Sequence, residues 1–133
     1  MYEWLKDYRK LTEEIAYLEN NLKRSKRELK RWVEGDLSKI KLEVDSDGAK
    51  LEDRIERIEN LLQNKKNDLD LLIKLINTFT GLDNKILRMK YIENKTLEQI
   101  AEELNYSAGY IYKKHAEIMR TIKFAEKLNL NLQ

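Results

Sequence analysis

The sequence contains no cysteine and no proline, and it has only four glycines in 133 residues. Without cysteine the chain forms no disulfide and no thiolate metal site, which fits a reducing cytoplasm. The shortage of residues that break helices, together with 38% charged residues and abundant Leu, Lys, Glu and Ile, indicates long helices rather than sheets. We therefore expect an all-α protein.

Long hydrophobic runs and a strong net charge are also missing. The apolar runs are much shorter than the roughly 20 residues that a bilayer-crossing helix needs, and the N-terminal MYEWLKDYRK lacks the apolar centre of an export signal. We expect no membrane partner. The formal net charge is only +2, and residues 1–81 carry equal numbers of cations and anions. Nucleic-acid binding must therefore come from the local placement of charge.

Two long segments carry apolar residues at alternating spacings of three and four. The first predicts one unbroken helix over residues 2–34, with a seam that is polar only at Ser25. The second predicts a helix over residues 50–77, with a seam that is polar only at Lys65. Because the seams match in length, they predict a long antiparallel coiled-coil hairpin, which we assign to a domain of residues 1–80.

The segment that joins the two helices has two interpretations. Residues 39–44 alternate between polar and apolar side chains, which suits a short extended strand. Residues 35–48 as a whole suit a mobile loop equally well, and the sequence leaves both interpretations open.

A basic run also has two interpretations. Residues 23–31 contain six cations in nine positions and could bind phosphate. In the hairpin, however, this run lies across from Glu52, Asp53, Glu56 and Glu59. We favour pairing between the helices over phosphate binding.

Residues 69–76 are apolar on more than one face, so a second element packs against them. That element is either the C-terminal domain or a second chain, and a homo-oligomer through the hairpin or through the Leu71–Ile76 face is an open alternative. Residues 78–81 then interrupt the periodic pattern, and a further helix is predicted from residue 82 to about residue 93.

Residues 96–121 predict two short helices joined by a tight turn. Thr96 and Gln99 form a capping box at the start of the first helix, and Ser107 is a natural N-cap of the second. A small residue, a turn residue and a β-branched anchor stand at the spacing of a helix-turn-helix: Ala101, Asn105 and Ile111.

Residues 82–122 resemble region 4 of sigma-70 factors in Ile86-Leu87, Met89–Tyr91, Thr96–Leu104 and Tyr106-Ser107. The whole chain resembles small phage-encoded transcription regulators of the ArpU and RinA type. The resemblance implies a sequence-specific DNA-binding regulator, an activator of transcription for a phage or mobile element in the cytoplasm of a bacterial host. Its implied partners are double-stranded DNA and RNA polymerase.

The resemblance also implies which residues meet DNA. The helix-turn-helix domain is assigned to residues 81–123, followed by a tail of residues 124–133, and the second helix of the motif enters the major groove. The start of this helix differs from sigma proteins, which often carry larger polar or basic residues there. The expected DNA-binding residues are Lys95, Thr96, Ser107, Ala108, Gly109, Tyr110, Tyr112, Lys113 and Lys114. Packing of Tyr110 against Leu97 is an equal alternative to contact with DNA.

No arrangement of residues suggests an enzyme. His115 is the only histidine, and the chain has neither a glycine-rich phosphate loop nor a Ser/His/Asp set. We expect no catalytic residue, no metal site and no cofactor. Two other functions stay open: a phage DNA-packaging protein of the small-terminase type that recognises DNA, and an adaptor that binds RNA polymerase.

Overall fold

The computed structural model of the chain describes the backbone of residues 2–34 and 41–132 and the side chains of residues 5–34 and 50–128. All elements in these ranges are helices, which confirms the all-α prediction for them. The chain divides into two compact units. Residues 10–69 form what we call the helix-pair unit, and residues 1–9 and 70–133 form the terminal unit.

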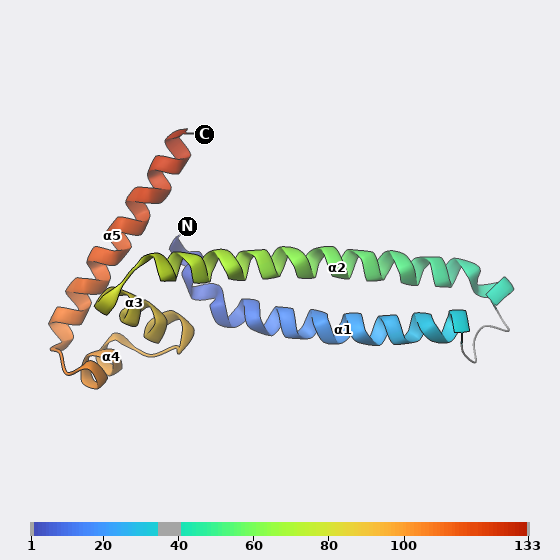
Figure 1. The fold of residues 1–133 in the computed structure, drawn as a ribbon, viewed down its shortest axis with the longest axis horizontal. Coiled ribbons are helices and arrows are strands. Elements are labelled where there is room, and N and C mark those ends of the chain that lie inside the picture. Colours follow the sequence, from blue (N-terminus) through green and yellow to red (C-terminus); the bar gives the residue numbers. More distant parts are fainter. Residues whose placement is uncertain (1, 35–40, 133) are drawn as a thin grey trace. The chain divides into compact units, whose positions relative to one another are not determined.

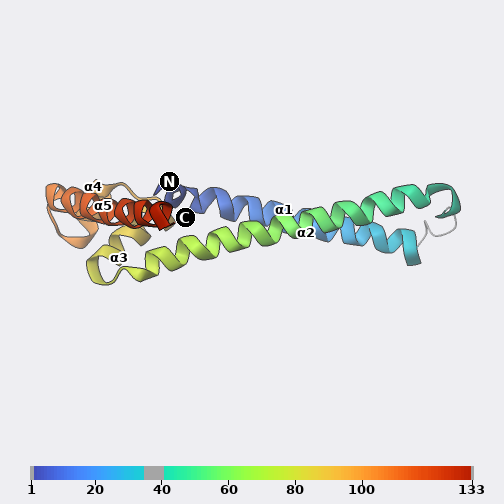
Figure 2. The ribbon, with the colours of Figure 1, turned by 90° about the horizontal axis from the view of Figure 1, so that it is seen from above.

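The helix-pair unit consists of parts of two long helices, α1 (Tyr8–Glu34) and α2 (Lys41–Thr78). Within this unit the two helices lie side by side and run in opposite directions (Figures 1 and 2). The residues buried between them come from the two apolar seams: Leu11, Ile15, Leu51, Ile55, Ile58 and Leu62. Ser25, the polar position of the first seam, is also buried, with 5% of its surface exposed.

Ion pairs join α1 to α2 along the flanks of this apolar seam. Lys65 Nζ lies 2.6 Å from a carboxylate oxygen of Glu14, and the hydrogen bond between them lowers the pKa of Glu14. A second pair joins Lys66 to Glu19 at 3.6 Å. Because these pairs are solvated, each contributes little stability, and burial of the apolar seam holds the helices together.

Two boundaries differ from the sequence-based prediction. Residues Tyr2–Asp7 form a 3-10 helix, η1, so the predicted helix over residues 2–34 is α-helical only from Tyr8 onward. Helix α2 begins at Lys41, so both open interpretations were wrong in part: the strand for residues 41–44 and the mobile loop for residues 41–48. The rest of the predicted loop or strand, residues 35–40, lies outside the described residues.

The terminal unit combines η1, the end of α2 and the elements that follow: α3 (Gly81–Leu87), η3 (Arg88–Ile92), α4 (Leu97–Leu104) and α5 (Ala108–Leu132). Its core draws side chains from nearly every element, and eight of the largest are completely or almost completely buried: Leu5, Leu72, Ile76, Ile86, Leu87, Ile100, Ile111 and Ile118. Residues 1–9 and 70–80, which the sequence analysis assigned to the hairpin domain, therefore lie in this unit.

The apolar residues of positions 71–76 are only partly buried, and Ile73 and Leu75 are half-buried. Leu72 and Ile76 are completely buried, whereas Leu71 remains 61% exposed. The terminal unit thus buries Leu72 and Ile76, and the homo-oligomer stays a prediction. In the part of the chain that the structure describes, every helix falls short of the apolar length that a membrane crossing requires.

The predicted helix of residues 82–93 contains a π-helical turn that the sequence analysis did not foresee. Thr80 precedes the helix, which begins at Gly81 with φ +59. The last turn is the π-helical η3, in which Glu93 N donates to Arg88 O at 3.0 Å. Because a π turn closes over five residues, Ile86 and Tyr91 both face the core.

The turn between α4 and α5 has the predicted chemistry. Asn105 adopts the left-handed conformation, with φ 62 and ψ 42, and its backbone N–H reaches the carbonyls of Ala101 and Glu102. Tyr106 N also donates to Ala101 O at 2.9 Å. Ser107 then caps α5, because its Oγ accepts the backbone N–H of Tyr110 at 3.1 Å.

The single histidine lies beside the core of the terminal unit. His115 Nε2 lies 2.7 Å from the hydroxyl of Tyr91, and the two rings stack with centroids 5.9 Å apart. Burial lowers the pKa of His115 below its ordinary value of 6.5, and the charges of Lys90 and Lys6 lower it further. His115 therefore acts as a neutral packing residue.

Substitution of Asn105 tests the turn. A β-branched residue cannot adopt the left-handed conformation without a steric cost of about 1–2 kcal/mol, so Asn105→Val is expected to lower the free energy of unfolding by about that amount. Asn105→Gly serves as the matched control and is expected to leave stability unchanged or to raise it. Denaturant unfolding followed by circular dichroism measures both, and equal losses in the two variants would refute the role of the turn.

The lowered pKa of His115 predicts a pH dependence of stability. As the pH falls below about 6.5, the unfolded chain binds a proton before the folded chain does. The free energy of unfolding should therefore decrease as the pH falls through this value and level off below the folded-state pKa. Replacement of His115 by Gln should flatten this part of the curve, and an unchanged curve in the variant would show that another group titrates there.

Candidate nucleic-acid interface

The start of α5 is an open surface. Ser107, Ala108 and Gly109 are all exposed. A Cβ built on Gly109 would meet no atom within 4 Å, so no described residue outside the helix backbone covers this position. The hydroxyl of Ser107 accepts the backbone N–H of Tyr110 and so caps the helix. Because the first turn of α5 carries small side chains, another molecule can approach its backbone closely.

Two tyrosines form an exposed aromatic pair beside this surface. The rings of Tyr106 and Tyr110 stack with centroids 5.0 Å apart, and the residues are 45% and 41% exposed. Tyr110 thus stacks on the residue at the end of the turn, while Leu97 is buried in the core. An exposed tyrosine pair offers flat apolar area and two hydroxyl groups to a partner.

The hydroxyl of Tyr112 is bound within the chain. It donates a hydrogen bond to the carboxylate of Glu98 in the first turn of α4. The bond lowers the pKa of Glu98 and raises the pKa of Tyr112, so Glu98 stays ionised at neutral pH. A negative charge therefore lies directly beside the exposed start of α5.

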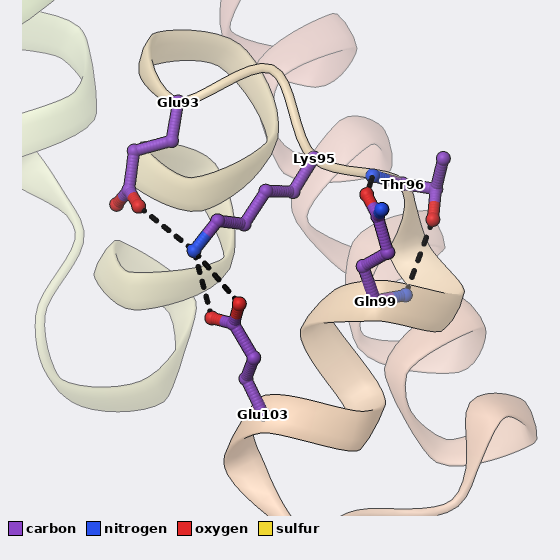
Figure 3. A network of polar contacts seen from close by, with 5 residues as sticks. All are labelled: Glu93, Lys95, Thr96, Gln99 and Glu103. Carbon is purple, nitrogen blue, oxygen red and sulfur yellow. Dashed lines mark hydrogen bonds and ion pairs between the residues drawn. The ribbon is translucent and has the colours of Figure 1, made fainter.

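Lys95 is held by two carboxylates, as Figure 3 shows. Its Nζ lies 3.1 Å from Glu93 and reaches both carboxylate oxygens of Glu103, at 2.9 and 2.8 Å. Hydrogen bonding to Glu103 and then to Glu93 raises the pKa of Lys95. This network gives the segment before α4 a fixed shape but neutralises a lysine that the sequence analysis assigned to DNA.

Thr96, beside Lys95, is used by the helix cap. Its Oγ1 accepts the backbone N–H of Gln99 at 3.1 Å, and the Gln99 side chain accepts the Thr96 N–H at 2.9 Å (Figure 3). The capping box predicted from the sequence is thereby confirmed. Both donors of the cap are satisfied inside the chain, so Thr96 positions α4.

Lys114 is paired with an acidic side chain of α3. Its Nζ lies 3.1 Å from Asp83 Oδ1 and 4.0 Å from Glu117, and the bond to Asp83 raises the pKa of Lys114. Because Asp83 Oδ1 is itself buried, the pair joins α5 to α3. Lys114 therefore helps to hold α5 against α3 through this ion pair.

Three cations remain exposed on one row of α5. Lys113, Arg120 and Lys127 are seven residues apart, which aligns them along the helix at intervals of about 10.5 Å. None of the three forms an ion pair with a carboxylate in the described ranges. They form a row, which we call the α5 cation row, on the same helix as the open Ser107–Gly109 surface.

The sequence analysis named Lys113 but not Arg120 or Lys127. It ended the DNA-binding domain at residue 123, whereas α5 continues as a helix to Leu132 (Figure 1). The seven-residue spacing of the three cations was the available signal. It becomes meaningful only when the helix is known to continue through Lys127.

Comparison with known proteins gave no relative. No family model matches the sequence, and searches of curated proteins and of solved structures found no match.

Proposed function

We propose that the chain is a sequence-specific DNA-binding regulator of transcription, an activator in a phage or mobile element. Helices α4 and α5 act as a helix-turn-helix of the sigma-70 region 4 type, and α1 and α2 act as an antiparallel coiled-coil hairpin. The observation that carries the proposal is the turn between α4 and α5, with Asn105 in the left-handed conformation between the cap at Thr96 and the cap at Ser107.

The packing around this turn supports the same proposal. Ala101 and Ile111 are buried where α4 and α5 pack together, and the first turn of α5 stays exposed. A recognition helix needs this arrangement, because its N-terminal residues must reach base edges while its inner face packs on the first helix. The small residues Ala108 and Gly109 allow the backbone to approach the groove closely.

The charges support a specific mode of contact. The α5 cation row offers phosphates three charges that have no carboxylate partner among the described side chains, whereas Lys95 and Lys114 are already neutralised by carboxylates. We infer that Lys113, Arg120 and Lys127 provide the electrostatic part of the affinity. Tyr110 and Tyr112 then contact bases or the sugar-phosphate backbone beside them.

The carboxylates near α4 favour one second candidate, an adaptor that binds RNA polymerase and contacts DNA only weakly. Glu98 is ionised beside the start of α5, and Glu93 and Glu103 neutralise Lys95. Such a surface repels phosphates locally, and it suits a basic protein partner.

Binding to duplex DNA tests the main proposal. The full chain is used to select from a random duplex pool at low salt, and enrichment of one sequence motif is the expected result. Each cation of the row that contacts a phosphate should contribute a slope of about one to the dependence of log affinity on log salt. Lys113→Ala and Arg120→Ala are therefore expected to lower the slope by about one each.

Lys95→Ala is the matched control, since it removes the same charge from a lysine that is already paired. Its slope should change much less. If no duplex binds at low salt, the proposal fails. If binding is retained in all variants but transcription is lost, the adaptor is the better description.

A substitution at Glu98 separates the two candidates further. Glu98→Gln removes the negative charge but keeps an acceptor for the Tyr112 hydroxyl, so DNA affinity should rise by about twofold to fivefold, as expected for loss of one exposed like charge. Glu102→Gln, in an exposed position of the same helix, controls for the change in net charge. Equal effects of the two variants in a fluorescence anisotropy titration would exclude a local role for Glu98.

A further inference from the structure

Four arginines converge on one pocket of the helix-pair unit. Arg24, Arg27 and Arg31 of α1 and Arg54 of α2 line a pocket of about 360 Å³, a volume within the usual range of ligand sites. The only acidic residue in its lining is Glu28. The lining thus carries a formal charge of +3, although the chain as a whole carries only +2.

The helical period explains why these arginines meet. Positions 24, 27 and 31 fall on one side of α1, whereas Lys26 lies outside the pocket and its Nζ approaches Glu59 of α2 at 3.8 Å. The pocket side of α2 presents Arg54 instead. The favoured sequence-based interpretation, pairing of the basic run with acidic residues of α2, therefore holds for Lys26 but not, among the described side chains, for Arg24 and Arg27.

Three of these arginines lack a carboxylate partner among the described side chains. Arg24, Arg27 and Arg54 form no ion pair with any carboxylate among the described side chains. Like charges that face each other across packed helices are unfavourable, and Glu28 alone cannot balance them. An anion in the pocket would remove this repulsion and bind through several guanidinium groups at once.

The geometry points to a binding site for phosphate groups in this arginine pocket. Guanidinium groups bind phosphate oxygens through paired N–H donors, and four of them around one concave surface suit a ligand with two or more phosphates. Such phosphates can belong to a free oligophosphate or to the backbone of a nucleic acid. The site lies within α1 and α2, so it stands independently of the function proposed for α4 and α5.

Titration of the full chain with sodium tripolyphosphate at constant ionic strength tests the site. Calorimetry should detect binding, and the ligand should raise the Tm because it binds the folded state. The triple variant Arg24→Gln, Arg27→Gln, Arg54→Gln should weaken binding by about tenfold or more, since each charge-assisted hydrogen bond is worth roughly that factor. Without ligand the variant should be at least as stable as the unmodified chain, because the repulsion is gone.

A second triple variant provides the matched control. Lys23→Gln, Lys30→Gln and Arg57→Gln remove the same charge from exposed positions outside the pocket, so tripolyphosphate binding should fall by less than about threefold. Equal losses in the two variants would mean that the overall charge attracts the ligand, and they would overturn the proposal. Absence of binding to the unmodified chain would overturn it as well.

Duplex DNA distinguishes the two sources of phosphate. If the pocket variant also lowers the salt slope of DNA binding by about one per lost contact, the pocket holds a nucleic-acid backbone. If tripolyphosphate binding is lost while DNA binding is unchanged, the ligand is a free oligophosphate. Failure of the chain to bind DNA at all would remove the function proposed for α4 and α5 but would leave the tripolyphosphate result intact.

Discussion

The turn at Asn105 is the constraint on which the terminal unit depends. Its left-handed backbone ends α4 and allows Tyr106 N to donate to Ala101 O, so that α5 begins only three residues later, at Ala108. Ala101 and Ile111 are then buried where the two helices pack, and the first turn of α5 is left open. The exposed first turn of α5 is therefore a consequence of backbone geometry, because a longer connection between α4 and α5 would change where α5 begins.

In both units, carboxylates pair with some of the lysines and arginines and leave others without a carboxylate partner among the described side chains. In the terminal unit, carboxylates of α3, of α4 and of the segment before α4 pair with Lys114 and Lys95, which fixes the local shape, whereas the three cations of the α5 cation row have no carboxylate partner in the described ranges. In the helix-pair unit, the two sides of α1 meet different charges of α2, acidic beside Lys26 and basic beside Arg24 and Arg27. A net charge near zero is thus compatible with local surfaces that are strongly positive or strongly negative.

Much of the local structure followed from the sequence, and the errors have physical causes. The capping box at Thr96 and the left-handed Asn105 depend only on neighbouring residues, so short-range rules were sufficient to predict them. The π-helical turn at Arg88–Ile92 was missed because it depends on which side chains the core accepts, and Ile86 and Tyr91 are both buried there. The strand and the loop interpretations both failed from Lys41 onward, because a short local pattern cannot outweigh the continuation of a long helix.

By itself, the sequence determined the helical class, the two apolar seams and the capped turn, because each of them depends on residues that are only a few positions apart. Only the tertiary structure decided which charges remain available. Lys95, Lys113 and Lys114 look alike along the chain, yet two of them are held by carboxylates that folding brings near, while Lys113 is left in a row with Arg120 and Lys127. The physical reason is that the pairing of a charge depends on distances across elements, which no local pattern contains.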